Sequence, residues 1–387
     1  MLLLILPLAV LVVLQLRKGF RAPKPSVSGR AASPTGNARR AAGPASAGAE
    51  IATRYNNLIK LAGGESVWLK HPAQAIGGSQ RLPDGEALAL APALRSIIGA
   101  MERQSAHDGL RLQVRADPAK SGEASSAQEI AVLEGDRPIC LWRLRLVARL
   151  YRAAIVIDDL GQNFKAAREL LAVPYPLTFS VLPNLPASRE TALAANRAGR
   201  EVMLHLPMEP LAPQLSPGEG AIRVGMRGAE VERVIETDLA SVPYAAGVNN
   251  HMGSRATSDP ALMAAVMKDL APRHLYFIDS RTAASTVALE AARRAGIPSF
   301  YRSVFLDDTS TVEYTLGQMG RFREAIEEHG EALAIGHPHA TTIRALEESL
   351  PQLERHDIEV VPASRLVGLP DVARLSPSPA RTDGNGN

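Results

Sequence analysis

The sequence is poor in cysteine, in aromatic residues and in long apolar runs, and each shortage excludes something. Cys140 is the single cysteine among 387 residues, so an intrachain disulfide framework and a multi-cysteine metal site are both excluded. Aromatic residues make up 4% of the chain, too few to mark a binding cleft. Hydrophobic residues nevertheless make up 46%, which is enough for a sizeable core.

Positive charge is scarce outside the N-terminal end. The formal net charge is +3, but residues 1–50 contain seven lysines and arginines against one acidic residue, Glu50. Residues 51–387 contain 36 basic and 39 acidic residues, so the body of the chain is mildly acidic. It lacks the basic footprint of a nucleic-acid-binding protein, and we expect no nucleic-acid partner. The basic residues beside the apolar N-terminus suit membrane headgroups instead.

The apolar run at the N-terminus, MLLLILPLAVLVVLQL, has 16 residues. About 20 residues are needed to span a bilayer core. No basic segment precedes the run and no small-residue cleavage site follows it, which favours a hydrophobic anchor in residues 1–20 over a cleaved signal segment. We therefore expect a membrane-anchored protein of the cell envelope, with its body in the periplasm or otherwise outside the cytoplasm. The basic residues after the run, taken literally, favour the opposite topology.

Composition and periodicity divide the rest of the chain. Residues 21–50 are rich in Pro, Ala, Ser and Gly and predict a flexible linker. Residues 51–150 predict a small α+β domain for packing or interaction, and residues 370–387 a disordered tail. In the small domain, apolar spacing predicts a helix at Glu86–Gln104, and alternation predicts strands at Leu110–Ala116, Glu129–Leu133 and Ile139–Val147.

Residues 151–369 alternate regularly between apolar strands and amphipathic helices. This alternation indicates a parallel sheet with outer helices, and hence a (β/α) barrel of seven to eight strands, regular or irregular. Gly199 and Gly296 follow two of the helices, where a glycine cap is expected. We expect strands at Ala153–Ile157, Leu177–Leu182, Val202–Leu206, Ala246–Val248, Leu275–Ile278, Ser299–Phe305, Ala332–Ile335 and Ile358–Val361, and helices at Phe164–Ala172, Ala187–Ala198, Ala229–Leu239, Pro260–Leu270 and Thr286–Ala295.

Polar residues able to bind a metal or move a proton follow most of the predicted strands. A parallel sheet places its active site at the carboxyl ends of its strands, so these residues are expected to gather there. In chain order they are Asp158-Asp159, Pro183-Asn184, His205 with Glu209, Asn249-Asn250-His251, Asp279-Ser280-Arg281, Asp307-Asp308 and His337-Pro338-His339.

Each of these residues also has a purely structural interpretation. The pair Asp158-Asp159 could cap the next helix, but adjacent carboxylates repel unless a cation or a proton separates them, which favours metal binding or acid–base chemistry. His205 and Glu209 are four residues apart, yet Pro207 and Pro210 forbid a regular helix between them. His205 is then either a metal ligand or an isolated hydrogen-bonded histidine.

The later motifs leave similar alternatives. His251 lies in a polar turn, which Asn249 and Asn250 could simply form. Asp279 either orients a histidine or pairs with Arg281. His337 and His339 either cap the following helix or supply a general acid.

Together these residues resemble the divergent polysaccharide deacetylase family, distant relatives of the NodB-type deacetylases. The resemblance spans about residues 153–368 and is carried by VIDDLG, HLPMEP, GVNNHMGS, FIDSRT and IGHPH. It implies that Asp158 is the catalytic base, that Asp159 is a metal ligand and that His337 is the catalytic acid. The related enzymes have a histidine pair four residues apart, of which His205 matches the first.

Glu209 stands in the place of the second histidine. Either Glu209 completes the metal sphere, or His251 does so from the neighbouring strand. We favour Asp159, His205 and His251, because two imidazoles and one carboxylate suit catalytic Zn²⁺ with an open water position.

The resemblance implies metal-assisted hydrolysis of an acyl group on a polysaccharide or peptidoglycan-like glycan of the cell envelope. Glu209, Asn250, Asp279 and His339 would be supporting residues or alternative ligands, and no organic cofactor is expected. A rival interpretation is a catalytically inactive envelope protein that keeps the fold and binds a glycan or a protein partner. A third is a metal-dependent esterase or phosphoesterase with an unrelated substrate.

Overall fold

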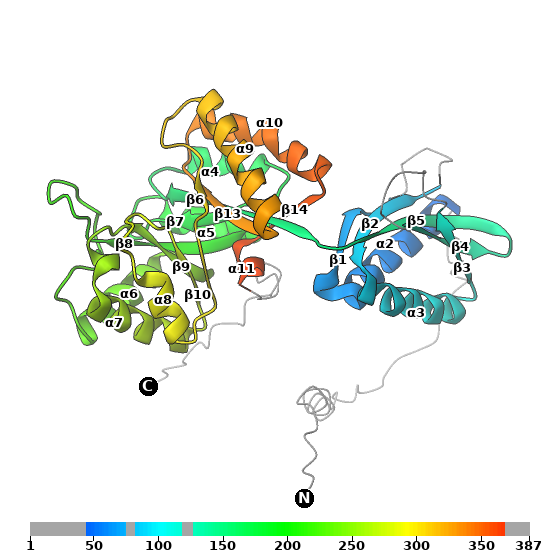
Figure 1. The fold of residues 1–387 in the computed structure, drawn as a ribbon, viewed down its shortest axis with the longest axis horizontal. Helices are drawn as coiled ribbons and strands as arrows, with labels where there is room; N and C mark the ends of the chain where they lie inside the picture. The colour runs from blue at the N-terminus through cyan, green and yellow to red at the C-terminus, as the bar shows by residue number, and fades with distance from the viewer. Residues whose placement is uncertain (1–43, 75–81, 118–126, 368–387) are drawn as a thin grey trace, which may run out of the picture. The chain divides into compact units, whose positions relative to one another are not determined.

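A computed structural model of the protein describes residues 44–74, 82–117 and 127–367 (Figure 1). The predicted anchor at 1–20, residues 21–43 of the predicted linker and the predicted tail at 370–387 lie outside the described residues. The last part of that linker was predicted wrongly, because helix α2 (Pro44–Gly63) already includes residues 44–50. Their sequence, PASAGAE, has a proline in the first turn followed by alanines, and both favour a helix. No helix of the described ranges is long and apolar enough to cross a membrane.

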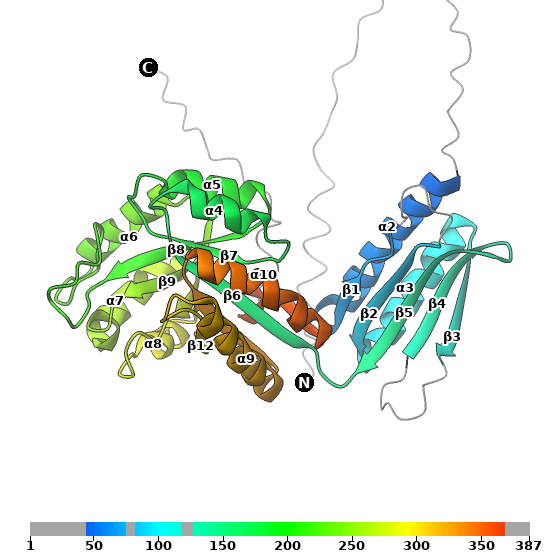
Figure 2. The same cartoon turned by 90° about the horizontal axis from the view of Figure 1, so that it is seen from above.

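The first sheet has five strands in the order β1-β2-β5-β4-β3, with β2 and β5 parallel and the other pairs antiparallel. Helices α2 and α3 cover one face of it, and Ile59, Ile97 and Trp142 lie in the core between them (Figure 2). Its elements are β1 (Val67–His71), β2 (Asp84–Leu90), α3 (Ala91–Asp108), β3 (Arg111–Asp117), β4 (Ala127–Glu134) and β5 (Arg137–Val147).

The helix predicted at Glu86–Gln104 was wrong in its first five residues, which belong to β2. The run EALAL is apolar enough to satisfy either a helical or a strand pattern. Its pairing with β5 over the full length of β2 decides in favour of the strand.

The second sheet has nine strands, all parallel, in the order β11-β10-β9-β8-β7-β6-β13-β12, with β14 also paired to β6 (Figure 1). The predicted (β/α) barrel is confirmed. Its strands are β6 (Tyr151–Leu160), β7 (Thr178–Val181), β8 (Glu201–Met208), β9 (Ala245–Met252), β10 (Tyr276–Asp279), β11 (Ser299–Tyr301), β12 (Val304–Phe305), β13 (Glu331–Gly336) and β14 (Ile358–Val361).

All but the last helix of this domain pack on the outer face of the sheet (Figures 1 and 2), whereas Ala363 and Leu366 of the last, short helix pack on its inner face. Gly199 and Gly296 follow α5 and α8 with φ of 68° and 72°, so their predicted capping role is confirmed. The helices are α4 (Phe164–Ala172), α5 (Ser188–Arg197), α6 (Ala229–Ser241), α7 (Pro260–Leu270), α8 (Ala288–Arg294), α9 (Val312–His329), α10 (Ala340–Arg355) and the short α11 (Ala363–Leu366).

The segment predicted as one strand, Ser299–Phe305, is split into β11 and β12. β11 pairs with β10 at one end of the sheet, whereas β12 pairs with β13 at the other end. At the break, the Arg302 amide donates to the carbonyl of Asp279 and the Ser303 amide to that of Leu333. A single short segment therefore joins both ends of the sheet, which must curl into an irregular barrel.

Alternation along each strand separates two cores. On β6, Ala153, Ile155 and Ile157 pack beneath the outer helices. Ala154 and Val156 pack in the second core, together with Tyr276, Ile278 and Leu333 from other strands, on the inner face of the curled sheet. Because strand side chains alternate, the polar residues that continue the inner set at the carboxyl ends point into the mouth of the barrel.

Candidate metal and acid–base site

Two adjacent carboxylates reach one site at the end of β6. Neighbouring residues on a strand normally point to opposite faces. Here the pairing of β6 with β7 shifts register between Ile157 and Leu160, and Asp159 has a φ of 56°. Aspartate tolerates this left-handed conformation better than most residues. The irregularity brings Asp158 Oδ2 to 3.5 Å and Asp159 Oδ1 to 3.2 Å from the same atom, His205 Nε2.

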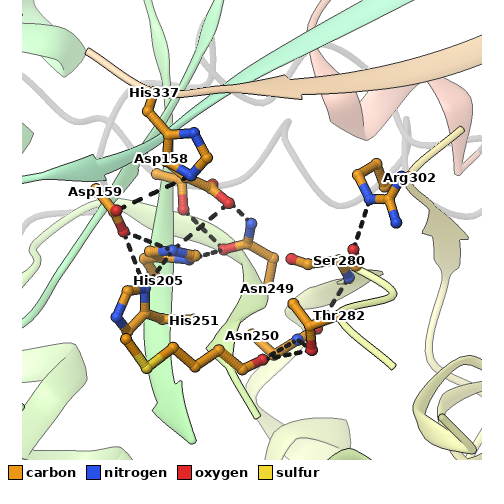
Figure 3. Close-up of polar contacts among 12 residues, drawn as sticks. Asp158, Asp159, His205, Asn249, Asn250, His251, Ser280, Thr282, Arg302 and His337 are labelled. Atoms are coloured by element: carbon orange, nitrogen blue, oxygen red, sulfur yellow. Dashed lines mark hydrogen bonds and ion pairs between the residues drawn. The ribbon is translucent and has the colours of Figure 1, made fainter. Parts of the chain in front are cut away.

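Three donor atoms form a compact triangle beside this irregularity (Figure 3). Asp159 Oδ1 lies 2.9 Å from His251 Nδ1 and 3.2 Å from His205 Nε2, and the two ring nitrogens are 3.1 Å apart. The three residues come from β6, β8 and β9, and are separated by up to 92 positions in sequence. The three residues predicted as metal ligands are thus brought together in a group that could hold a metal ion.

The triangle fits a zinc-sized cation. Two donors each about 2.0–2.1 Å from a tetrahedral Zn²⁺ lie about 3.3 Å apart, close to the separations seen here. Asp159 Oδ1 is buried and receives no well-aligned hydrogen bond from a described residue, although both ring nitrogens lie within 3.2 Å. A buried carboxylate oxygen without a hydrogen-bond donor lowers the stability of the folded protein unless a cation or a proton binds to it.

Asn249 fixes which nitrogen of His205 faces this triangle. Its Nδ2 donates to Asp158 Oδ1 at 2.8 Å, which orients the amide because a carboxylate only accepts. Its Oδ1 then accepts from Ser180 Oγ at 2.7 Å and from His205 Nδ1 at 2.8 Å. With the proton held on Nδ1, the neutral imidazole directs its Nε2 lone pair at the triangle, as a metal ligand requires.

The site is built to hold positive charge. Burial opposes ionisation of Asp159, but the two imidazoles outweigh it and lower the pKa of this carboxyl well below its usual range. Burial likewise opposes a charge on His205, whereas Asp158 and Asp159 raise its pKa. Carboxylates and imidazoles that stabilise a positive charge between them provide the environment that a divalent cation needs.

A second pair lies at the adjoining strand ends. His337 Nδ1 lies 2.8 Å from Asp307 Oδ1, and the other ring nitrogen faces the triangle at 4.0 Å from Asp159 Oδ2. Asp307 also accepts from the His337 amide and from Thr342 Oγ1, both at 2.6 Å, so its position is fixed. Burial opposes the charge on His337, but Asp307 and the paired aspartates raise its pKa to about 9.

Glu209 is engaged outside the triangle. Its Oε1 accepts from Arg255 at 2.7 Å and its Oε2 from the Val224 amide at 2.7 Å, which joins the loop after β8 to the segment after β9. The group able to hold a metal at β6, β8 and β9 does not include it.

The other predicted supporting residues also have partners of their own. Asn250 Oδ1 accepts from the Ser280 amide at 2.9 Å, and its Nδ2 donates to the carbonyl of Met252 at 2.8 Å. Asp279 accepts from the Arg281 amide, Thr286 Oγ1 and the Leu289 amide, so it organises the turn into α8. His339 is exposed at the start of α10, 6.0 Å from His337 between ring centroids. A supporting or metal-binding role for Asn250, Asp279 and His339 stays a prediction.

Asn249 and Asp307 are among the polar residues that the sequence places at strand ends, but it assigned neither of them a role in the site. A signal for Asn249 was available, because residues 249 and 251 share one face of a strand whereas residue 250 points away. For Asp307, the sequence pattern indicated its place at a strand end but contained no signal for its pairing with His337. Its partner His337 is 30 positions away, and β12 is only two residues long.

Comparisons with known proteins find relatives of the domain that carries this site. Residues 155–367 match the family described as divergent polysaccharide deacetylase. The uncharacterized protein YibQ of Escherichia coli K12 is 40% identical over 227 residues, which cover 58% of this chain and 70% of that protein. An uncharacterized protein of Haemophilus influenzae is 37% identical over 210 residues, covering 54% and 74%.

The fold also has a solved counterpart. The crystal structure of an uncharacterized protein from Agrobacterium tumefaciens C58 aligns with a TM-score of 0.54 at 24% identity. The alignment covers 57% of this chain and 90% of that one, and it supports the fold alone.

Proposed function

This chain belongs to the divergent polysaccharide deacetylase family, and we propose that it is a metal-dependent hydrolase that removes acyl groups from a cell-envelope polysaccharide. One observation carries the proposal. The donor atoms of Asp159, His205 and His251 converge within 3.2 Å of one another, beside a buried carboxylate and a histidine–aspartate pair. This proximity supports an assignment in which the metal ligands, the base and the acid share one mouth of the barrel.

Asp159, His205 and His251 would hold the cation, and their chemistry suits Zn²⁺. When bound, such a metal lowers the pKa of a water molecule toward about 7 and polarises the acyl carbonyl. The three residues leave a coordination position for that water, because structural zinc sites use four protein ligands and catalytic sites three.

Asp158 is the proposed base. Its side chain is 3% exposed, and Asn249 holds Oδ1 through a hydrogen bond of 2.8 Å. Oδ2 remains directed toward the same space as His205 Nε2, 3.5 Å away. A carboxylate oriented in this way accepts the proton of the attacking water, whereas Asp159 next to it is committed to the metal.

His337 is the proposed acid. Asp307 accepts the proton of Nδ1 and leaves Nε2 facing the site. The pKa of about 9 keeps the imidazole protonated at neutral pH, so it can deliver a proton to the departing amine or alcohol. Asp307 positions His337 and stabilises the imidazolium.

The test combines metal analysis with turnover of the purified full-length protein. Asp159→Asn is the sharpest variant, because asparagine accepts the left-handed backbone at this position and removes the charge. We expect about one zinc per chain in the wild type, loss of metal in Asp159→Asn and His205→Ala, and retention in the control His329→Gln, an exposed histidine at the end of α9. The substrates are acetylated chitooligosaccharide, peptidoglycan and an acyl-ester panel.

Turnover that disappears with the metal supports the hydrolase. Stoichiometric metal without turnover on the whole panel contradicts it and favours the glycan-binding alternative. Absence of metal from the wild type after growth and purification with added Zn²⁺ contradicts the site itself.

We also propose that the protein is attached to the membrane by residues 1–20 with its body outside the cytoplasm. A polysaccharide of the envelope is accessible from that side. An alkaline phosphatase fused to the C-terminus is expected to be active, since this reporter needs an oxidising compartment. An inactive but fully expressed fusion contradicts this topology.

A further inference from the structure

Two arginines without a carboxylate partner flank the candidate site. Arg302 lies at the break between β11 and β12, and Arg281 lies two residues after β10 with its guanidinium over the Tyr301 ring, 5.0 Å from the centroid. Within the described ranges, neither guanidinium has a carboxylate oxygen within 4.0 Å. The nearby Asp279 is occupied, since its oxygens accept from the Arg281 amide, Thr286 Oγ1 and the Leu289 amide. The two cations therefore leave positive charge at this rim.

The Arg302 side chain is held in place by two hydrogen bonds, but some of its N–H groups have no partner. Its Nε donates to the carbonyl of Ser280 at 2.7 Å and its Nη2 to that of Arg281 at 2.9 Å. A guanidinium has five N–H groups, so three remain available. Burial and the neighbouring Arg281 lower the pKa of Arg302, while Asp308 and Asp279 act in the opposite direction. A half-buried guanidinium without a carboxylate partner lowers the stability of the folded protein unless an anion binds beside it.

Arg302 lies one aromatic ring away from the proposed acid. Its guanidinium stacks on Phe305 at 3.8 Å from the ring centroid, and Phe305 stacks against His337 at 6.3 Å. On the other side, the Ser280 amide binds Asn250, next to Asn249 and His251 (Figure 3). The Phe305 ring thus lies between the Arg302 guanidinium and the imidazole of His337.

Ser280 supplies a second, independent indication of a ligand. Its side chain is 1% exposed, and its Oγ has no hydrogen-bond partner among the described residues. It continues the inner set of β10, and Figure 3 shows its hydroxyl pointing toward Asn249, into the site. A buried hydroxyl aimed at a binding site without a partner is suited to a ligand.

We infer that Arg302, Arg281 and Ser280 bind an oxyanion on the glycan, a carboxylate or a phosphate on the sugar beside the acyl group, so that the substrate is an acidic polysaccharide. The inference rests on the proposed function, because it takes the neighbouring site as the place where the acyl group is bound. The planar guanidinium fork matches both oxyanions in a bidentate geometry.

Equilibrium binding to three oligosaccharides tests this inference. The first alternates N-acetylglucosamine with N-acetylmuramic acid, the second is the same tetrasaccharide with its carboxylates reduced to alcohols, and the third is a chitotetraose phosphorylated at oxygen 6. Titration calorimetry of the full-length protein gives Kd for each. We expect an acidic ligand to bind about tenfold or more tightly than the reduced one. The arm with the stronger preference identifies carboxylate or phosphate.

Substitutions separate recognition from structure. Arg302→Gln should abolish the preference, and Arg302→Lys should keep only part of it, because a lysine lacks the fork. Arg302 also joins two segments, so Arg281→Gln serves as a second variant that leaves the Arg302 contacts to backbone carbonyls intact. Arg294→Gln, an exposed arginine on α8 paired with Glu290, is the matched control.

Equal Kd values for acidic and reduced ligands in the wild type overturn the inference. So does a preference that survives in both Arg302→Gln and Arg281→Gln. Turnover without any acid preference refutes this inference but leaves the hydrolase standing. An arginine-dependent preference without turnover supports acidic-glycan recognition and refutes the hydrolase.

Discussion

Asn249 Oδ1 lies 2.8 Å from His205 Nδ1, and this contact decides which imidazole nitrogen is available to a metal. Replacing Asn249 by alanine removes the acceptor for Nδ1 and the donor to Asp158. We expect zinc affinity to fall about 10- to 100-fold, the usual effect of losing a residue that orients a metal-binding histidine. Competition with a chelator of known affinity measures the change.

Asn250→Ala is the control for that experiment. Asn250 is the next residue on β9 but contacts the loop at Ser280 and Met252, not His205. Zinc affinity that is unchanged in Asn249→Ala, or equally reduced in both variants, would show that the tautomer is not set by Asn249.

The pKa of His337 should depend on Asp307. Asp307→Asn removes the carboxylate that holds the imidazolium, so the pKa should fall from about 9 by one unit or more. NMR titration of the His337 ring in metal-free protein measures this directly. In the active enzyme, the loss of rate at alkaline pH should begin at lower pH in the variant.

The raised pKa of His337 also determines how the stability of the folded protein changes with pH. The folded pKa is raised above the ordinary value of 6.5, so the extra stability is fully present below about pH 6.5 and is lost as the pH rises through about 9. His339→Gln should leave both profiles unchanged. A titration midpoint of His337 that is the same with and without the Asp307 carboxylate contradicts the assignment.

Ionisation of the buried Asp238 should lower the free energy of unfolding as the pH rises toward neutral. It is fully buried on α6, and burial raises its pKa to about 7 against the opposing hydrogen bond from Asn184. The folded protein therefore binds an extra proton between about pH 4 and pH 7, and stability declines as the pH rises through this window. Asp238→Asn should stabilise the protein at pH 8 by about 1–3 kcal/mol.

Urea unfolding at pH 5 and pH 8 checks this expectation, with the exposed Glu236→Gln on the same helix as the control. The gain should be larger at pH 8 than at pH 5. An equal change at both values would indicate a packing effect with no contribution from ionisation.

Ser280→Ala should separate binding from folding. The hydroxyl is buried without a partner, so its removal is expected to leave the midpoint of thermal unfolding unchanged or slightly raised. Affinity for the acidic oligosaccharide should nevertheless fall several-fold. A variant that loses stability but keeps its affinity would assign Ser280 to the scaffold.

The repeating strands and helices of the barrel could be predicted because buried parallel strands form continuous apolar runs between amphipathic helices. The convergence of Asp159, His205 and His251 followed from the same pattern, since each stands at a strand end. The sequence pattern did not indicate the register shift that brings Asp159 to the same site as Asp158. That shift depends on pairing with β7, a contact between distant positions.

Other parts of the site depended on partners far apart in the chain. Glu209 pairs with Arg255, 46 positions later, and nothing in the local sequence links the two. Asp307 is fixed by Thr342, 35 positions later. The division of the segment 299–305 was missed although Arg302 and Ser303 interrupt its apolar residues, because two polar residues in a short strand pattern do not show that the chain changes neighbours.

That change of sides has a mechanical consequence. β11 and β12 do not pair with each other, so the barrel wall is closed between them by the polypeptide chain itself. A closed sheet would instead have a row of inter-strand hydrogen bonds at this place. Widening the mouth at this seam requires rotation about a few backbone bonds near Arg302 and the loss of few hydrogen bonds. If the proposed polysaccharide enters the barrel, we expect the wall to yield at this point of the rim, while Asp159, His205 and His251 on β6, β8 and β9 keep their places.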